Sequence, residues 1–324
     1  MKRIAVSLLL FIIAVSLHAQ VWRWQHPKPQ GNNLNAVDFY DGNTGYAVGD
    51  NGTILKTTNG GIAWVAQQSG ISTNLLTVCV SPASAQYAVA AGTNNTYVYT
   101  ADGGNTWTAG NVTASNVNAG YNWRGSFFYF VNNEVFLCGD NGYIVESVDN
   151  GATFAASVRT GAPSYISNRH RSNDTLYSLA FYASSKPAIG FGIVVGSNSH
   201  VSVTSDGGNS WVDTNFVTPG FTLTGVAVPP IGGYIDGSIV GYNAQGGGEI
   251  WHTTNNGYTW STSSSSTNFT YLGVALDDFG DGPLFAVSQQ GRVATVSTSN
   301  LNWNADLYFN SNNTQLNAVS YPTD

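Results

Sequence analysis

An eight-residue motif recurs six times along this chain and limits it to folds that are built from repeats. Its most complete copy, TADGGNTW, ends at Trp107. The six copies end at Trp64, Trp107, Phe154, Trp211, Trp260 and Trp303. Successive copies are therefore 43, 47, 57, 49 and 43 residues apart, which is close to the length of one four-stranded propeller blade.

Each copy of the motif stands in the same order of strand-like segments. A short alternating segment comes first, as in 34–40 (LNAVDFY) and 75–81 (LLTVCVS), and an apolar segment such as 45–49 (GYAVG) follows. Asn-Gly and Asp-Gly pairs separate the segments, as antiparallel hairpins require. We therefore predict an all-β fold, a β-propeller whose blades are four-stranded and antiparallel.

The two ends of the chain predict a blade shared between the termini. Trp24 precedes Trp64 by 40 residues, so 21–29 (VWRWQHPKP) is expected to be an outermost strand. The segment 316–324 (LNAVSYPTD) copies the innermost strand at 34–42. We therefore predict seven blades, six complete and the seventh incomplete, and expect the natural protein to continue beyond Asp324. Six complete blades with loose terminal arms is the alternative.

The first 19 residues predict a cleavable signal peptide. Lys2 and Arg3 precede an apolar stretch at 4–15, and Ala19 supplies a small residue for cleavage. The apolar stretch is shorter than the roughly 20 residues that a membrane-spanning helix needs. We therefore predict an exported protein, with residues 1–19 as signal peptide, 20–324 as a single propeller domain, and no transmembrane span after cleavage.

The exported chain is acidic, which argues against nucleic acid as a partner. The whole chain has 11 basic and 18 acidic residues, so removal of Lys2 and Arg3 leaves 9 against 18, a net charge of −9. Nucleic-acid binding normally needs a basic surface. Cys79 and Cys138 both lie in apolar segments. Two buried thiols are favoured over a disulfide, although export would permit one.

The repeated motif resembles the Asp box, S/T-x-D-x-G-x-T-W, of sialidase-like and sortilin-like propellers. Its polar side chain is expected to close a turn by bonding to its own backbone, and its glycine and aromatic residue to shape and pack that turn. This structural role is favoured over catalysis or calcium binding because one box supplies one carboxylate. The predicted structural residues are Asn59, Gly61, Trp64, Asp102, Gly104, Trp107, Asp149, Gly151, Phe154, Asp206, Gly208, Trp211, Asn255, Gly257, Trp260 and Trp303.

A longer pattern, GYAVGDNGTILKTTNGG followed by a tryptophan strand, resembles the photosystem II assembly and stability factor family of Asp-box, or BNR-repeat, propellers. The resemblance extends over residues 22–324. It implies the propeller fold, and as one possible role an assembly factor for a membrane complex. The leader and the Ser/Thr/Asn-rich composition are similar to secreted Bacteroidota cell-surface members, which often end in a type IX secretion sorting domain.

Two long loops, 111–125 and 159–174, gather four of the six arginines of the exported chain. They are expected on the face where ligands usually bind propellers, and arginine there suits a carboxylate or phosphate group. Aromatic side chains beside them could stack on a sugar or an aromatic group. The alternative is solvated arginine, with Trp123 covering a strand. The candidate ligand-binding residues are Tyr121, Trp123, Arg124, Arg159, Arg169, His170 and Arg171.

No catalytic motif accompanies these residues. The sialidase Arg-Ile-Pro motif is missing, and the five histidines lack metal-ligand spacing. Asp50 and Asp140, in GDNG turns, are the first suspects for a two-carboxylate glycosidase, but they are expected to shape those turns. The sequence thus favours a non-catalytic, cofactor-free and metal-free module that binds protein or glycan at the cell surface. A sialidase-like or two-carboxylate glycoside hydrolase, and an assembly factor, are the alternatives.

Overall fold

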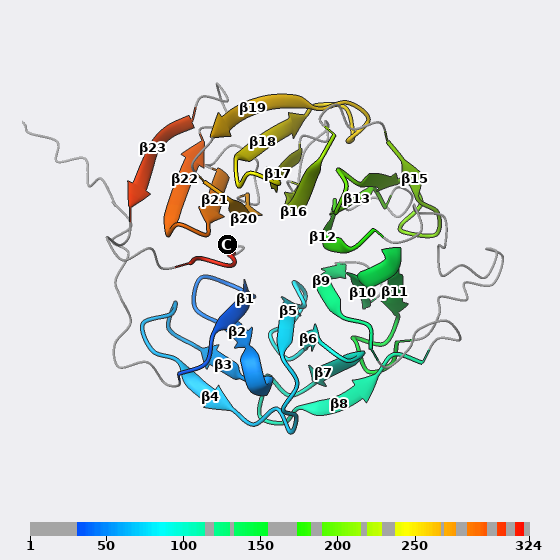
Figure 1. The fold of residues 1–324 in the computed structure, drawn as a ribbon. Helices are drawn as coiled ribbons and strands as arrows, with labels where there is room; N and C mark the ends of the chain where they lie inside the picture. The colour runs from blue at the N-terminus through cyan, green and yellow to red at the C-terminus, as the bar shows by residue number, and fades with distance from the viewer. Residues whose placement is uncertain are drawn as a thin grey trace, which may run out of the picture.

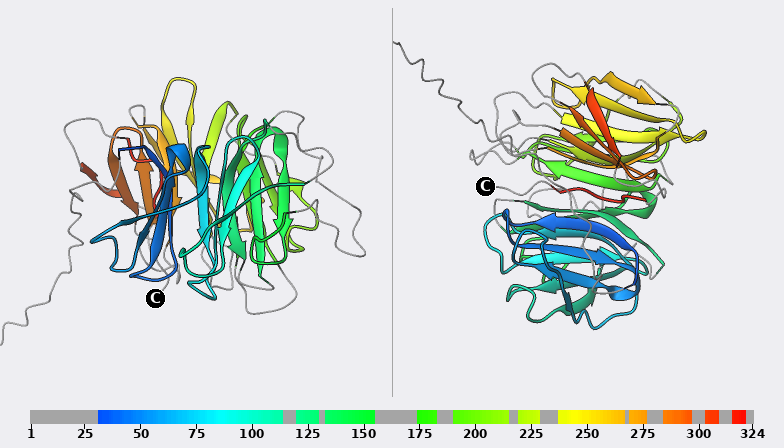
Figure 2. Two further views of the ribbon diagram at one scale, coloured as in Figure 1. Left: turned by 90° about the horizontal axis from the view of Figure 1, so that it is seen from below. Right: turned by 90° about the vertical axis from the view of Figure 1, so that its left-hand side faces the viewer.

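The computed structural model describes residues 31–113, 120–129, 133–154, 174–182, 190–214, 219–228, 237–266, 269–276, 284–296, 303–308 and 315–320. These residues form antiparallel sheets arranged in a ring around a central axis (Figure 1). The all-β propeller predicted from the repeat is confirmed. Seen from the side, the ring is a disc whose strands run between its two faces (Figure 2).

Among the described residues, six sheets follow one another along the chain, and within each sheet neighbouring strands are also consecutive in the sequence. Blades one to three comprise β1 (Leu34–Phe39), β2 (Gly45–Gly49), β3 (Ile54–Thr57) and β4 (Val65–Gln67); β5 (Leu75–Val80), β6 (Ala88–Gly92), β7 (Thr96–Thr100) and β8 (Thr108–Asn111); and β9 (Trp123–Tyr129), β10 (Glu134–Gly139) and β11 (Ile144–Ser147). Blades four to six comprise β12 (Leu176–Phe181), β13 (Gly192–Gly196), β14 (Val201–Thr204) and β15 (Val212–Asp213); β16 (Phe221–Ala227), β17 (Gly237–Asn243), β18 (Gly248–Thr253) and β19 (Ser261–Ser266); and β20 (Tyr271–Ala275), β21 (Leu284–Ser288), β22 (Arg292–Val296) and β23 (Trp303–Tyr308).

The second strand of each blade lies in the core between neighbouring blades. Every residue of β2, β6 and β13 is buried, so both faces of these strands are covered. Their sequences, GYAVG, AVAAG and GIVVG, are continuously apolar or glycine, as a strand buried on both faces requires. No blade can bury both of its faces alone, so the blades stabilise one another around the ring.

The Asp-box turns are closed by hydrogen bonds from their own side chains. In blade two the Thr100 hydroxyl donates to Asp102 (2.8 Å) and accepts the Gly104 amide (2.8 Å), while Asp102 accepts the amide (2.9 Å) and hydroxyl (2.7 Å) of Thr106. These bonds, led by the Thr106 amide, hold the pKa of Asp102 below its usual value. Gly104 has φ +83°, a conformation that glycine adopts without strain.

The same turn recurs in blades one, three, four and five. The third-position residues Asn59, Asp149, Asp206 and Asn255 each accept the backbone amide four residues later, at 2.8 to 2.9 Å. The glycines at the fifth position are Gly61, Gly151, Gly208 and Gly257, with φ between +75° and +85°. Asparagine therefore replaces aspartate without loss of the turn.

The motif's aromatic residue is buried in three blades and packs against another ring in two more. Phe154, Trp211 and Trp260 are buried. Trp107 packs edge-on against Tyr46 of the preceding blade (5.6 Å between ring centroids), while Trp64 packs against Phe39 of its own blade (6.0 Å). Trp303 begins β23, and the polar part of the sixth box lies outside the described residues.

Neighbouring innermost strands are joined by side-chain hydrogen bonds around the central axis. The bonds run from Asn35 to the Leu75 carbonyl (2.9 Å), from the Val80 amide to Asp38 (2.8 Å), between Thr77 and Ser126 (2.7 Å), from the Val226 amide to Ser178 (3.3 Å) and from Thr224 to the Tyr271 carbonyl (2.9 Å). Between β20 and β1, segment 315–320 takes part instead, and Ser320 donates to Asp38 (3.0 Å).

The described residues form six blades, and segment 315–320 lies where the incomplete seventh blade was predicted to begin. Six antiparallel sheets are present, and the fourth strand expected in blade three lies outside the described residues. Segment 315–320, predicted as the start of a seventh innermost strand, lies between the first and last sheets near the central axis (Figure 1). The expected outermost strand at 21–29 and the signal peptide at 1–19 lie outside the described residues.

Cys79 in β5 and Cys138 in β10 are both buried and free, as the sequence favoured. Burial raises the pKa of both thiols far above its usual value. Among the described residues, no helix is long and apolar enough to cross a membrane.

Replacing Thr100 by valine should destabilise the fold, because Thr100 is 1% exposed and its hydroxyl bonds both the box carboxylate and the Gly104 amide. We expect Thr100→Val to lower the free energy of unfolding by about 1–3 kcal/mol, measured by urea denaturation. The matched control is Thr108→Val on the exposed strand β8, which should change stability little. Equal effects of the two variants would contradict this role of the hydroxyl.

Asp38 should make stability fall as pH rises. Burial raises its pKa from 3.8 to about 6, although hydrogen bonds from Val80 and Ser320 oppose this. A carboxyl with a raised pKa stabilises the fold below its unfolded-state value of 3.8 and loses that contribution as pH rises through 6. As pH rises, the free energy of unfolding of the wild type should therefore fall by up to about 3 kcal/mol relative to that of Asp38→Asn. The fall is smaller if water reaches the carboxylate.

The measurement is urea denaturation of the wild type and Asp38→Asn at intervals between pH 4 and pH 8. All other carboxyl groups are common to the two proteins, so their contributions cancel in the difference. A difference that is constant across this range would contradict the raised pKa of Asp38.

Candidate functional site

The turn between the second and third strands repeats one device in blades one and three. Both sequences read GDNG, and both form a single 3₁₀ turn, η1 (Asp50–Gly52) and η2 (Asp140–Gly142). Asn51 and Asn141 take positive φ values of 55° and 56°. Because the strands alternate in direction, these turns share a face of the disc with the connections between blades. We call this face the loop face.

Asp50 and Asp140 shape the entrance to their own blades, as the sequence favoured. In blade one the Asp50 carboxylate accepts hydrogen bonds from the side chains of Asn33 (2.9 Å) and Asn35 (3.1 Å). In blade three Asp140 accepts the backbone amide (3.2 Å) and side-chain amide (2.7 Å) of Asn122. Each carboxylate therefore fastens the incoming chain to the turn of the same blade.

Blade three differs from blade one because an arginine replaces one asparagine. The Arg124 Nε atom donates to Asp140 at 2.8 Å, and the two side chains are 32% and 20% exposed. The guanidinium group also lies 5.4 Å from the ring centre of Tyr177, on the innermost strand of blade four. Among the described residues, Arg124 bonds to Asp140 through Nε, and 32% of its side chain remains exposed.

A depression of about 500 Å³ opens around this pair on the loop face. Its lining combines a guanidinium group, a phenol ring, an amide and one carboxylate, which together can donate and accept several hydrogen bonds. The lining residues are Gly120, Tyr121, Arg124, Asp140, Asn141 and Thr175. The depression spans the junction of blades three and four, because Arg124 and Asp140 come from blade three and Thr175 directly precedes β12 of blade four.

The structure separates the two aromatic candidates. Tyr121 lines the depression, and its ring packs against that of Tyr143 with 5.0 Å between centroids. Trp123 is only 1% exposed, and its indole N–H donates to the side chain of Asn95 (3.0 Å). Trp123 thus anchors the core, in line with the alternative that it covers a strand. The other predicted site residues, Arg159, Arg169, His170 and Arg171, lie outside the described residues.

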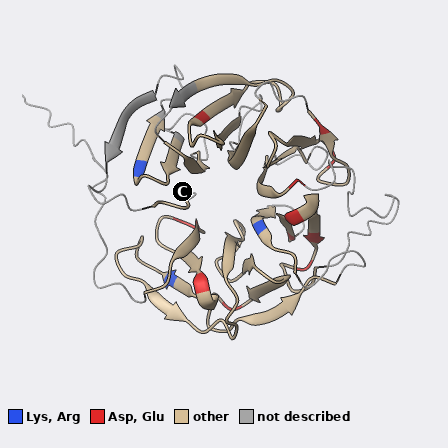
Figure 3. Cartoon of the chain, in the orientation of Figure 1, with Lys and Arg blue, Asp and Glu red and all other residues tan. Residues whose placement is uncertain are grey.

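The predicted arginine cluster is represented in the described residues by Arg124. The described basic residues are Lys56, Arg124 and Arg292, and they lie on three different blades (Figure 3). Arg292 stacks 3.5 Å from the ring centre of Phe269 in blade six. Among the described residues, no group of three or more His, Cys, Asp and Glu side chains could hold a metal ion.

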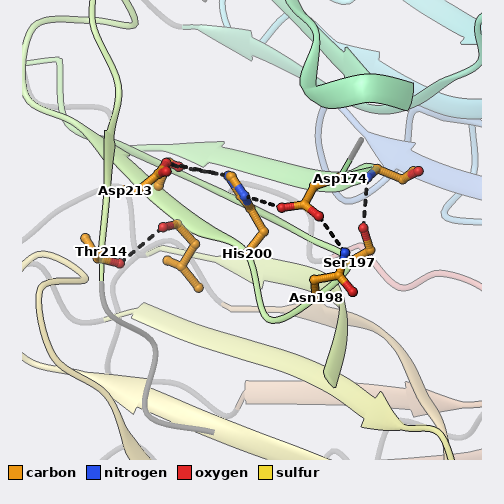
Figure 4. A network of polar contacts seen from close by, with 9 residues as sticks. Asp174, Ser197, Asn198, His200, Asp213 and Thr214 are labelled. Carbon is orange, nitrogen blue, oxygen red and sulfur yellow. Dashed lines mark hydrogen bonds and ion pairs between the residues drawn. The ribbon is translucent and has the colours of Figure 1, made fainter. Parts of the chain in front are cut away.

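Blade four contains a buried polar chain that resembles a Ser-His-Asp triad in its connectivity (Figure 4). His200 contacts Asp174 through Nδ1 (3.1 Å) and the Ser202 hydroxyl through Nε2 (2.9 Å). The Ser202 hydroxyl donates to Asp213 (2.7 Å). Because that hydroxyl gives its one proton to Asp213, it accepts from Nε2, so this ring nitrogen carries a proton.

This chain of contacts is structural. Ser202 has no exposed surface, so no substrate can reach its hydroxyl group. Asn198 also donates to Asp174 (2.6 Å), so the network joins the turn, the third strand and the fourth strand of one blade. The signal for it in the sequence was weak, because His200 stands in a segment, 200–204, whose residues are all buried, and Asp174 lies 26 residues earlier.

Sequence reasoning missed two residues that shape the depression. Thr175 lines it, and Tyr177 supplies the ring beneath Arg124. The contact of Tyr177 with Arg124 could have been inferred from position. Tyr177 is the second residue of the innermost strand of blade four, and Arg124 is the second residue of the innermost strand of blade three. Neighbouring innermost strands bring these equivalent positions together.

The fold and its turns define an Asp-box β-propeller. A family model described as photosynthesis system II assembly factor YCF48 matches residues 16–109. Over this stretch, less than a third of the chain, the sequence is similar to that family. No curated protein matches the sequence.

Solved structures share the fold. YCF48 from Cyanidioschyzon merolae has a TM-score of 0.58 at 18% identity, with 87% of each chain covered. The GH74 xyloglucanase from Xanthomonas campestris has a TM-score of 0.64 at 18% identity, covering 86% of this chain and 46% of the enzyme. U3-55K has a TM-score of 0.65 at 10% identity, covering 91% of this chain and 87% of that one. At these identities the likeness establishes the fold alone.

Removing the Asp140 carboxylate should destabilise blade three more than the equivalent change destabilises blade one. Asp140→Ala leaves the two Asn122 donors and Arg124 without their acceptor. We expect a loss of about 1–3 kcal/mol in the free energy of unfolding. The matched control is Asp50→Ala, whose turn has asparagine donors and no arginine. Urea denaturation at low and high salt measures the stability of both variants. If salt reduces the loss in free energy of unfolding for Asp140→Ala but not for Asp50→Ala, the difference is the contribution of the arginine ion pair.

Proposed function

We propose that this chain is an exported, non-catalytic binding or scaffold module that recognises a protein or a glycan at the cell surface. The observation that carries the proposal is the polar depression around Arg124 and Asp140. Arg124 is held from one side by Asp140 and lies over Tyr177, so its guanidinium group is fixed before a ligand arrives. A preorganised donor loses less side-chain entropy on binding.

The lining favours a ligand that combines an anionic group with a sugar or aromatic surface. Arg124 offers charged donors for a carboxylate or phosphate group. Tyr121 offers a ring, while Asn141 and Thr175 offer further polar groups. A signal peptide at 1–19 and secretion by the type IX route are part of the same proposal, supported by the leader sequence.

The hydrolase alternative is disfavoured by the carboxylates of the depression. Glycoside hydrolysis usually needs a pair of carboxyl groups placed about 5–10 Å apart. Among the residues that line the described depression, Asp140 is the only carboxylate, and Asn122 and Arg124 already occupy it. A role as an assembly or stability factor for a membrane complex is the second candidate, and the family match over residues 16–109 favours it.

Binding of defined anionic probes tests the first proposal. We expect 3′-sialyllactose or an acidic, tyrosine-rich peptide to bind in isothermal titration calorimetry, and Arg124→Ala to weaken that binding at least about ten-fold, or 1.4 kcal/mol. The matched control is Arg292→Lys, which alters an arginine on another blade. Absence of binding by both probes, or equal weakening by the two variants, would count against this site.

The assembly-factor candidate has a different readout. We expect deletion of the gene in its source organism to lower the amount of one multisubunit membrane complex on native gels, and the full chain to copurify with that complex. Unchanged levels of every such complex would exclude this candidate and leave the binding module.

A further inference from the structure

Segment 315–320 makes the contact to blade one that an innermost strand makes to the next blade. The side-chain amide of Asn317 donates to the Leu34 carbonyl at 2.7 Å. In these contacts the donor stands directly after a leucine of one innermost segment (Leu316, Leu34 or Leu223), and the acceptor is the apolar residue at the equivalent place in the next. The equivalent contacts run from Asn35 to Leu75 (2.9 Å) and from Thr224 to Tyr271 (2.9 Å).

The other flank of the segment repeats a second inter-blade contact. A methyl group on Gly273 of β20 would lie 3.3 Å from the Cα atom of Ala318. A methyl group on Gly125 of β9 would likewise lie 3.0 Å from the Cα atom of Ser178 in β12. Each of these four residues stands two positions after a large apolar residue, which is Tyr271, Leu316, Trp123 or Leu176. Segment 315–320 therefore packs on blade six as one innermost strand packs on another.

We propose that 315–320 is the innermost strand of a seventh blade, and that its outward edge is a binding site for a β-hairpin with the pattern of this chain's own second and third strands. In the complete four-stranded blades, a mostly buried, apolar second strand pairs with the innermost one. Within the described residues no strand pairs with 315–320, and the Leu316 amide donates to the Ser288 carbonyl (3.2 Å) of blade six. An unpaired edge of this kind accepts added strands through its main-chain groups.

The neighbouring blades define the chemistry of this hairpin. Its first strand must be apolar throughout, because it would be covered on both faces by blades six and one. Glycine suits its last position, because a Cβ atom on Gly49 would lie 1.9 Å from the Asn33 carbonyl oxygen where the innermost strand enters, although blade six has Ser288 there. The segment 44–57, TGYAVGDNGTILKT, has both properties.

A synthetic peptide that copies residues 44–57 provides the probe. We expect a fluorescently labelled peptide to bind the full chain saturably with one-to-one stoichiometry in fluorescence anisotropy, and to raise the melting temperature of the chain. A peptide carrying Gly49→Val should bind at least about ten-fold more weakly because its side chain meets the entering strand. A peptide carrying Val48→Pro should also bind more weakly because proline removes a ladder donor.

Two protein variants locate the site. Removal of residues 315–324 should abolish peptide binding, whereas Arg124→Ala should leave it unchanged, so this test is independent of the proposed loop-face function. If the shortened chain does not fold, the proposal is tested by comparing the binding of the wild-type and substituted peptides to the intact chain. The proposal is overturned if the wild-type peptide does not bind, if the substituted peptides bind equally well, or if a folded chain without 315–324 binds normally.

Discussion

The burial of the second strand in each blade is the constraint on which the rest of this structure depends. Strands such as β2 and β13 are apolar on both faces and lie between two neighbouring sheets. A single blade leaves such a strand half exposed, so stability comes from closing the circle rather than from any one sheet. The hydrogen bonds between innermost strands and the packing of Trp107 on the preceding blade act at the same junctions.

The repeat made the fold predictable because each copy of the motif marks the same turn. Thr100, Asp102 and Gly104 bond one another within five residues, so their spacing in the sequence determines the local structure. The copy of the innermost strand near the end of the chain likewise placed 315–320 between the first and last sheets. Local turn chemistry and strand alternation both leave a signature in the sequence.

The candidate site was harder to predict because its contacts join positions that are far apart in the sequence. Arg124 was identified from the scarcity of arginine, yet its partners Asp140 and Tyr177 come from a turn and from the next blade. Trp123 is adjacent in sequence but points into the core, since successive residues of a strand face opposite sides. Proximity to Arg124 in the sequence therefore did not predict a shared surface. The buried His200 network was equally hidden, because its residues come from several segments of blade four.

The two cysteines have a practical consequence for a protein that we propose to be exported. Cys79 and Cys138 are the only thiols of the sequence, and both are buried and unpaired. Because burial also raises the pKa of each thiol, little reactive thiolate forms in the folded state. The fold therefore needs neither an oxidising compartment nor a disulfide isomerase. The same native structure should be reached in a reducing cytosol and persist after transfer to an oxidising medium.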